Sequence, residues 1–421
     1  MRLAPLLVVR ALSCSRSRRF QYASSSWVQR SCLIALLSSV FSLLVCESTS
    51  GQTQSESPLM EPSNQYRVRE RNRAAVGCLL GTSVGDALGL PYEGISPARA
   101  LKMFGDLGHH HFLAGRGMTS DDTEHACFTA RAVLTSRGCP ERFVRHLAWS
   151  LRWWLLGLPA GVGFATLRSI LKLWVGFPPH RSGVMSAGNG PAMRSPILGV
   201  LLGENSHQLE DYVHRSTWVT HRDTKAYLGA MGTALAAFLS ACGSVVSPCG
   251  FLRFAEERLA GQDDQEFLSL IHRAVESAEK DQSTLEFAAS LGCDKGVSGY
   301  TYHTVPCVIQ AWLRFQDDFS GGMREILSAG GDTDTTGAIL GAIVGARVGK
   351  EGIPGEWLNG IIDWPRSTRW IEALADAVSS MIEGDADIKC PRYFGLGIIP
   401  RNVFFLLIVL AHGLRRLAPP Y

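Results

Sequence analysis

The sequence has 421 residues, is 46% hydrophobic and 19% charged, and carries a formal net charge of +3. A chain of this length and composition can bury a large core. Residues 1–50 hold six arginines and one glutamate, so the rest of the chain is close to neutral, at about −2. The body therefore lacks the basic patch that a nucleic-acid partner requires, and we expect no such partner.

Residues 1–72 form an N-terminal extension whose composition differs from that of the body. Residues 33–45 are mostly apolar and follow an arginine-rich flank, but they are shorter than the roughly 20 residues of a membrane span. They match the core of a signal peptide or anchor. The alternative is that translation starts near Met60. Residues 47–65 predict a disordered linker. The 11 cysteines include no Cys-x-x-Cys pair, which favours reduced thiols and a cytoplasmic body, with a membrane-anchored form if the extension is retained.

Two stretches of the body carry glycine at every fourth position. This spacing places the glycines of each stretch on one ridge of a helix. Glycine costs about 1 kcal/mol per helical position relative to alanine, so a whole ridge of it indicates a very close neighbour. We predict two helices packed tightly near the centre, with their ridges at Gly77, Gly81, Gly85 and Gly89 and at Gly337, Gly341, Gly345 and Gly349.

Each of two acidic turns precedes a helical segment of small residues. Asp332 and Asp334 stand two residues apart before one helix, and Ser120-Asp-Asp-Thr123 precedes the other. Hard oxygen ligands at a helix start favour a divalent cation. The alternative is ordinary capping, by Asp332 or Thr335 in one turn and by a box of Asp121 and Glu124 in the other.

If the two turns meet, four carboxylates share a small volume. Like charges about 4 Å apart repel by roughly 4 kcal/mol per pair at an effective dielectric near 20, so protons or cations must neutralise them. All-oxygen ligands suit Mg²⁺ or Mn²⁺, and the hydroxyls of Ser120 and Thr335 complete the ligand set. Such a two-metal site orients substrate hydroxyls and activates water.

Three further segments carry candidate roles. The loop around Gly188-Asn-Gly190 exposes backbone N–H groups that can hold phosphate, aided by Arg194. His221 stands where a loop meets a helix, and the alternative there is local packing. The apolar run 403–411 is too short to span a membrane, so it lies on a membrane surface or docks on the body, of which we favour docking. No segment alternates like a strand, so we predict an all-α fold.

Taken together and in order, these motifs resemble those of the ADP-ribosylglycohydrolase family. The resemblance covers roughly residues 70–350. Each motif alone is modest, and their common order makes the resemblance specific. Ser120 stands where the family often has threonine, and the hydroxyl is kept. The motifs are Gly77-Cys-Leu-Leu-Gly, Gly85-Asp-Ala-Leu-Gly-Leu-Pro-Tyr-Glu93, Ser120-Asp-Asp-Thr-Glu124, Ser186-Ala-Gly-Asn-Gly190 with Met193-Arg194, Thr220-His221, and Ser328-Ala-Gly-Gly-Asp-Thr-Asp-Thr335.

The resemblance implies a compact orthogonal bundle of helices over residues 73–400 with a central dinuclear metal cleft, followed by a tail helix at 401–421. It implies two Mg²⁺ ions, with Mn²⁺ as the alternative. By motif position the metal ligands would be Ser120, Asp121, Asp122, Asp332, Asp334 and Thr335. Substrate would be bound by Gly188, Asn189, Gly190, Arg194 and His221, and catalysis would involve Glu93, Asp121 and Asp334.

The implied activity is hydrolysis at the ribose C1″ of an ADP-ribosylated protein or a small ADP-ribose conjugate, which releases ADP-ribose. Glu93 is a metal ligand, a gate or an acid–base group in this interpretation. We expect a monomer, with membrane contact only through the N-terminal segment. The alternative is a non-catalytic member of the same fold that binds ADP-ribose or has a structural role.

Overall fold

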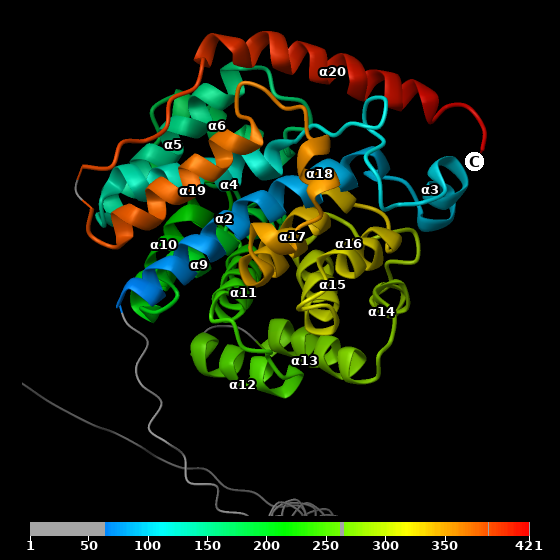
Figure 1. The fold of residues 1–421 in the computed structure, drawn as a ribbon, viewed down its shortest axis with the longest axis horizontal. Helices are drawn as coiled ribbons and strands as arrows, with labels where there is room; N and C mark the ends of the chain where they lie inside the picture. The colour runs from blue at the N-terminus through cyan, green and yellow to red at the C-terminus, as the bar shows by residue number, and fades with distance from the viewer. Residues whose placement is uncertain (1–63, 262–264, 386, 421) are drawn as a thin grey trace, which may run out of the picture. The chain divides into compact units, whose positions relative to one another are not determined.

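The computed structural model describes residues 64–261, 265–385 and 387–420. Residues 1–63 of the predicted extension (1–72) and most of the predicted linker (47–65) lie outside them, whereas residues 64–72 are helical and form the start of the first described helix. Residues 62–421 belong to one compact unit. Helices make up its framework (Figure 1). In chain order they are α2 (Asn64–Gly89), η1 (Leu90–Tyr92), α3 (Pro97–Phe104), α4 (Asp121–Ser136), α5 (Pro140–Leu156), α6 (Phe164–Trp174), α7 (Pro179–Ser182), α8 (Gly190–Met193), α9 (Pro196–Leu202), α10 (Ser206–Trp218), α11 (Thr224–Ala241), α12 (Pro248–Leu259), α13 (Gln265–Glu279), α14 (Thr284–Ser290), α15 (Thr301–Arg314), α16 (Phe319–Ser328), α17 (Thr333–Val348), η2 (Lys350–Gly352), α18 (Gly355–Gly360), α19 (Thr368–Ile382), η3 (Gly395–Gly397) and α20 (Ile398–Arg415).

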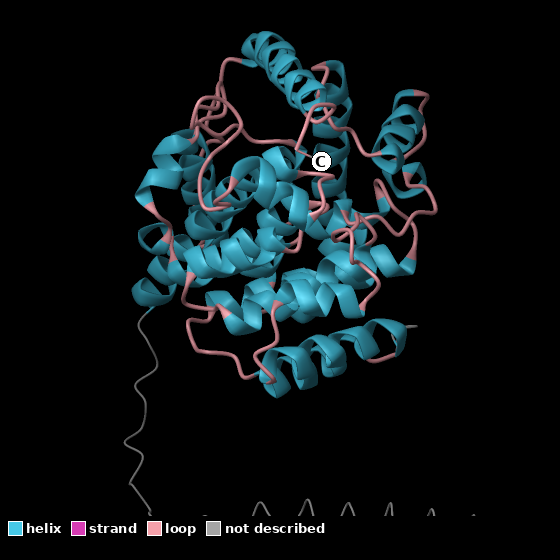
Figure 2. Cartoon of the chain, turned by 90° about the vertical axis from the view of Figure 1, so that its right-hand side faces the viewer, coloured by secondary structure: helices cyan, strands magenta, loops and turns pink. Residues whose placement is uncertain are grey.

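The predicted all-α fold is confirmed for the described residues. No strand is drawn among them in Figure 2, and their only β contacts are isolated bridges. The eight cysteines in this part of the chain are all free, as expected for reduced thiols.

Helices α2 and α17 run antiparallel through the centre and pack backbone to backbone. A Cβ atom added to Gly81 would lie 2.0 Å from the carbonyl oxygen of Gly341, and one added to Gly77 would lie 2.0 Å from that of Gly345. No side chain fits at these positions, so only glycine allows this approach. The two glycine ridges predicted from the sequence therefore face each other, and Pro91 follows the end of α2 as expected.

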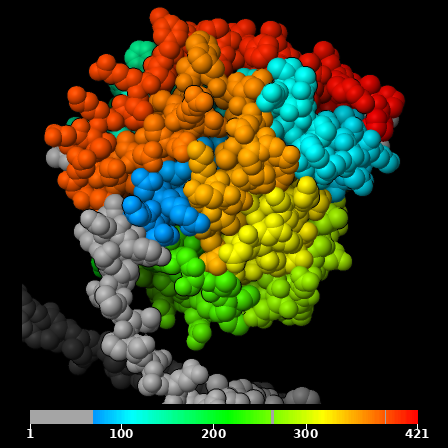
Figure 3. All heavy atoms as spheres, viewed as in Figure 1, coloured from blue at the N-terminus to red at the C-terminus, as the bar shows by residue number. Residues whose placement is uncertain are grey.

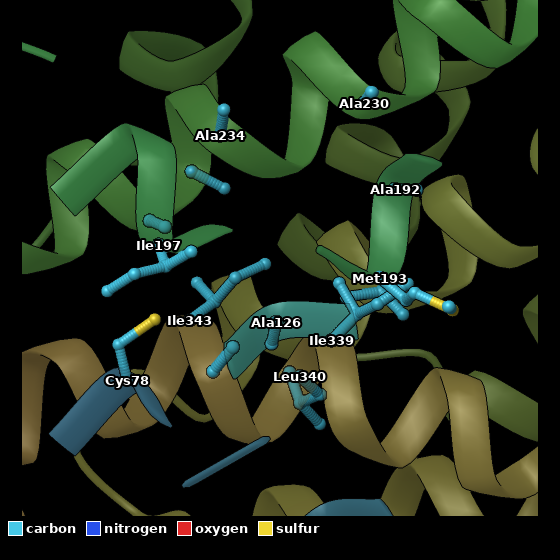
Figure 4. Close-up of a cluster of buried hydrophobic side chains, with 14 of the residues drawn as sticks. Cys78, Ala126, Ala192, Met193, Ile197, Ala230, Ala234, Ile339, Leu340 and Ile343 are labelled. Carbon is cyan, nitrogen blue, oxygen red and sulfur yellow. The ribbon is translucent and has the colours of Figure 1, made fainter. Parts of the chain in front are cut away.

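The remaining helices pack around this pair and form one main hydrophobic core. Figure 4 shows part of it, where Cys78 of α2, Ala126 of α4, Ile197 of α9 and Ile343 of α17 converge. These side chains are small or branched and fully buried. Because α2, α4 and α17 meet here, the starts of α4 and α17 are held at fixed positions relative to α2.

The C-terminal helix α20 lies on the outside of the body. It runs along the upper edge in Figure 1, and Figure 3 shows it at the surface beside the segment around α3. Phe405 and Ile408 pack inward on Leu90, Phe112 and Met118. The helix begins at Ile398, so the apolar run 403–411 is only part of a longer element that docks on the body.

Candidate active site

The first acidic turn is fixed by a buried carboxylate of α2. Ser120 is the N-cap residue of α4 and accepts a hydrogen bond from the N–H of Asp122. Fully buried Asp86 accepts hydrogen bonds from the N–H of Ser120 at 2.9 Å and from the hydroxyl of Thr123 at 2.5 Å. Glu124 accepts from Trp154 and Arg366, so it forms no capping box with Asp121. The carboxylates of Asp121 and Asp122 therefore take no part in a capping box with Glu124.

The second acidic turn opens α17. Asp332 occupies the N-cap position but makes no capping hydrogen bond with its side chain. Instead its Oδ2 accepts from the amide of Asn189 at 2.6 Å, and that amide also donates to Thr304. Asp334 Oδ1 accepts from the N–H of Thr335 at 2.9 Å. The carboxylate of Asp332 therefore does not cap α17, and the simple capping role is wrong for this residue.

The structure brings the two acidic turns together, although they are more than 200 residues apart in the sequence. The hydroxyl of Thr335 donates to Asp122 Oδ2 at 3.2 Å, and the hydroxyl of Ser120 reaches the same oxygen at 3.3 Å. Asp122, Asp334 and Thr335 are all buried. One small volume therefore holds carboxylates and hydroxyls from both turns.

The carboxylates in this volume are buried and repel one another. Burial raises the pKa of Asp122, and the carboxylates of Asp121, Asp86 and Asp332 raise it further. Burial also raises the pKa of Asp334, followed by the charges of Glu93 and its acidic neighbours. Burial and neighbouring charges disfavour the ionised forms in this way unless a cation neutralises them.

Glu93 reaches the same group from the loop after η1. The N–H of Gly94 donates to the carbonyl of Gly331 at 2.7 Å, and the N–H of Gly331 donates to Ile95. Gly331 has φ of +82°, a conformation that favours glycine. Glu93 is exposed as a residue, but its carboxylate is surrounded by enough protein that desolvation, followed by the charge of Asp332, raises its pKa, whereas the charge of Arg416 lowers it. The Gly330–Gly331 turn thus holds the Glu93 loop against the acidic turns.

The predicted substrate loop lies on the other side of Asp332. Asn189 links the two, and its N–H donates to the carbonyl of Gly299 at 3.0 Å. A Cβ atom added to Gly188 would lie 3.0 Å from His221 Nε2, so the imidazole packs directly beneath the loop. Burial and the charge of Arg194 lower the pKa of His221 to about 3, so the imidazole is neutral. Its Nδ1 lies 2.9 Å from the hydroxyl of Thr220.

Arg194 does not take the place predicted for it beside a phosphate. Its side chain is fully buried, and its guanidinium donates to Gly190 O, Ser216 and Thr220 Oγ1. Burial lowers its pKa to about 9. The guanidinium is occupied by protein groups, so Arg194 supports the Gly188–Gly190 loop and the residue before His221 from behind.

The oxygen atoms of the two acidic turns suit a hard cation, but they are not arranged as a complete metal site. Among the residues that the structure describes, no group of three or more His, Cys, Asp or Glu side chains is already arranged to hold a metal ion. Two of the predicted ligands, however, are the hydroxyls of Ser120 and Thr335. Asp122 Oδ1 is buried and has no hydrogen-bond partner. A buried carboxylate oxygen without a partner, among oxygen donors only, fits Mg²⁺ or Mn²⁺.

Sequence reasoning missed Asp86 and a second group behind the first turn. Asp363 accepts hydrogen bonds from the N–H and hydroxyl of Thr119, at 2.9 and 2.7 Å. Arg401 of α20 donates to Asp363 at 2.9 Å and also to the Thr119 carbonyl. Burial raises the pKa of Asp363, but the charge of Arg401 outweighs it and the net pKa is below its usual value. The signals for Asp86 were its isolated place inside the apolar run of α2 and its position in the motif that begins at Gly85.

The fold agrees with the family that the motifs resemble. The model of the ADP-ribosylglycohydrolase family matches residues 65–387, so the chain belongs to that family. The family members that are similar to this chain are hydrolases by name, and this protein is a hydrolase as well.

Several known proteins resemble the chain. ADP-ribosylhydrolase ARH3 of Bos taurus is 28% identical over 324 residues, which cover 67% of this chain and 86% of that protein. The ADP-ribosyl-[dinitrogen reductase] glycohydrolase of Rhodospirillum rubrum is 27% identical over 297 residues, which cover 68% and 89%. A solved ADP-ribosylglycohydrolase-related protein complex matches with a TM-score of 0.56 and 28% identity, over 75% of this chain and 99% of that one.

Proposed function

We propose that this protein is a Mg²⁺-dependent hydrolase that cleaves the bond at the ribose C1″ of ADP-ribosylated proteins or small ADP-ribose conjugates and releases ADP-ribose. The observation that carries the proposal is the meeting of the two acidic turns, where Thr335 donates to Asp122 at 3.2 Å. Relatives that act on ADP-ribosyl groups support the substrate class.

Two Mg²⁺ ions, or Mn²⁺ in their place, would be held by the oxygens of both turns. The proposed ligands are Ser120, Asp121, Asp122, Asp332, Asp334 and Thr335. Bound Mg²⁺ would supply positive charge that neutralises these carboxylates and polarises substrate and water oxygens. The hydroxyl ligands add no charge, so they complete the set without adding repulsion.

The protein's own groups account for binding and orientation. The N–H of Asn189 is already bonded to Gly299, but Gly188 and Gly190 carry no Cβ, so a diphosphate can approach their backbone N–H groups closely. Neutral His221 beneath the loop adds no charge that would compete with the metal for the phosphates. Asn189 connects the loop to Asp332, so substrate held by the loop lies next to the second acidic turn.

Hydrolysis also requires a group that accepts a proton from the attacking water. Glu93, Asp121 and Asp334 are the candidates because each is a carboxylate in the acidic group. Asp334 is buried, whereas Glu93 is exposed on its loop. A group that moves a proton to or from water needs contact with solvent, which favours Glu93 for this role and Asp334 for metal binding.

A substrate panel with and without Mg²⁺ tests the proposal. Peptides carrying ADP-ribosyl-serine or ADP-ribosyl-arginine, and O-acetyl-ADP-ribose, are incubated with the full chain, and released ADP-ribose is quantified. We expect turnover of at least one substrate, and its loss with a chelator. Binding of ADP-ribose without turnover of any substrate would instead identify a non-catalytic member of the fold.

Single substitutions separate metal ligands from the acid–base group. Asp334→Asn should abolish both Mg²⁺ binding, measured by titration calorimetry, and turnover. It should not unfold the protein, because asparagine keeps the hydrogen bond from Thr335 and removes a repelling charge. Glu93→Gln should abolish turnover and leave Mg²⁺ binding within about threefold. Asp376→Asn, on the exposed side of α19, is the matched control. Full turnover by the Asp334 variant would refute the metal site.

A further inference from the structure

The C-terminal helix α20 presents an apolar stripe to solvent. Its inward face carries Phe405 and Ile408, together with Arg401 paired to Asp363. The outward face carries apolar residues three and four positions apart, which places them in one line along the helix. They are Leu396 and Ile399 at the helix start, then Val403, Leu407, Leu410, Leu414 and Leu417, and each is between 45% and 75% exposed. The family match ends at residue 387, so this helix lies beyond the matched region.

The stripe continues onto helices α5 and α6. A hollow of about 660 Å³ is lined by Leu396 and Ile399 on one side and by Trp149 and Trp153 on the other. Trp153 contacts Trp174 of α6, with ring centroids 6.1 Å apart. These three tryptophans are between 42% and 55% exposed. The exposed apolar area is therefore continuous from α20 across α5 to α6.

The same face is basic. Residues 142–203, which include all of α6 and all of α5 beyond its first two residues, contain no aspartate or glutamate, and neither do residues 388–421. The one acid of α5, Glu141 in its first turn, pairs with Arg215 of α10. Exposed cations stand around the apolar area, including Arg145 of α5, Arg168 of α6 and Arg392 and Arg415 around α20. Two acids behind this face, Asp363 and Glu124, are buried in pairs with Arg401 and Arg366. Exposed tryptophans, leucines and cations without acids are the composition of protein surfaces that lie in the lipid headgroup region.

We propose that the face formed by α5, α6 and α20 docks on an anionic lipid surface, with α20 lying in the plane of the headgroups. A helix from another protein is a poorer fit, because a helix seam in water is flanked by charged residues, whereas the residues beside this stripe are uncharged up to Arg415 except for Arg401, which faces inward and is buried. Residues 395–415 are long and apolar enough to cross a membrane by length and composition alone. A spanning position is disfavoured, because it would break the buried Arg401–Asp363 pair.

Vesicle binding by the full chain tests the proposal. The probe is vesicles of phosphatidylcholine with about a quarter phosphatidylserine, against pure phosphatidylcholine. Leu407→Gln with Leu414→Gln should weaken binding to the anionic vesicles at least about tenfold, since each leucine loses its burial in lipid. The matched control, Val245→Gln with Leu285→Gln, changes exposed apolar residues on other elements and should bind normally. Turnover of a soluble substrate should be the same in both variants.

Fluorescence identifies which part of the chain meets the lipid. Lipids brominated in the acyl chain should quench tryptophan emission of the full chain, and Trp149→Phe combined with Trp153→Phe and Trp174→Phe should remove most of that quenching. Trp27→Phe should not, because Trp27 belongs to the N-terminal extension. Quenching that is lost only with Trp27 would overturn the proposal. So would binding unaffected by the leucine changes, or a dimer, seen by light scattering, that these changes dissociate without any lipid binding.

Discussion

Placing an alanine in the central glycine contact provides the most direct test of how the fold positions the site. A Cβ atom at Gly85 would lie 2.0 Å from the carbonyl oxygen of Gly337, and real Cβ contacts essentially never fall below 3.0 Å. Gly85→Ala must therefore push α2 and α17 apart by at least about 1 Å at this point. The obstacle is backbone, so no side chain can move aside to relieve it.

The energetic cost follows from two opposing terms. Overpacking of a tight core costs about 3 kcal/mol at the upper end of the usual range, which applies where backbone meets backbone. Alanine regains about 1 kcal/mol of helix propensity relative to glycine. We expect a net loss of about 2 kcal/mol in the free energy of unfolding. Gly77→Ala meets the carbonyl of Gly345, also at 2.0 Å, and should cost a similar amount.

The two variants should differ in activity. Gly85 adjoins Asp86, which fixes the first acidic turn, and Gly337 lies in the first turns of α17 near Asp334. Gly77 is about 12 Å further along α2. A shift of about 1 Å at a reacting centre can cost about a hundredfold in rate. Gly85→Ala should therefore lower kcat/KM of the folded protein by at least about tenfold, and Gly77→Ala should leave it nearly unchanged.

Urea unfolding followed by circular dichroism gives the stability, and release of ADP-ribose from the folded protein gives the activity. If Gly85→Ala is as stable as the unsubstituted chain, the backbone contact between α2 and α17 is wrong. If both variants lose activity equally, the loss follows general destabilisation and the proposed link between this contact and the acidic turns fails.

Two further predictions concern the charged groups of the site. Burial raises the pKa of Asp86 from 3.8 to about 6, so the folded state favours its protonated form. The metal-free protein should therefore lose about 3 kcal/mol of stability as pH rises from about 4 through 6. Titrations of the melting temperature with Mg²⁺ check this, because the stabilisation by Mg²⁺ should grow with pH. A Mg²⁺ effect that is independent of pH would contradict this. Arg401→Gln leaves Asp363 buried without its cation, so it should cost about 3–5 kcal/mol in urea unfolding and weaken Mg²⁺ binding through Thr119, whereas exposed Arg415→Gln should cost less than about 0.5 kcal/mol. Equal losses would rule out a special role for the buried pair.

The features that the sequence predicted well are those in which a local pattern has one physical explanation. Glycine at every fourth position is costly in a helix, so the close contact of α2 and α17 followed from the spacing alone. Two acidic turns before small-residue helices similarly predicted a shared volume, and Thr335 does reach Asp122. In both cases the residues would be unfavourable without the partner that the structure provides.

The direction in which a side chain points could not be predicted for helices that are apolar on every side. Nearly all of α17 is buried, so its pattern does not show which face meets which neighbour. Arg194 was assigned to phosphate because arginines beside glycine loops often bind anions. Its burial and its bonds to Ser216 and Thr220 depend on where α10 passes, which the local sequence does not contain.

Single charges whose partners are far away in the sequence were missed for the same reason, and Arg401 shows how much depends on them. In the sequence it is one cation beside an apolar run, which suggests the flank of a membrane segment. In the structure it pairs with Asp363 and so decides which side of α20 faces the body. Because that side is fixed, the line from Leu396 to Leu417 must face outward. The pair that supports the first acidic turn thus also creates the exposed stripe, which links the chemistry of the site to the surface that we propose meets the lipid.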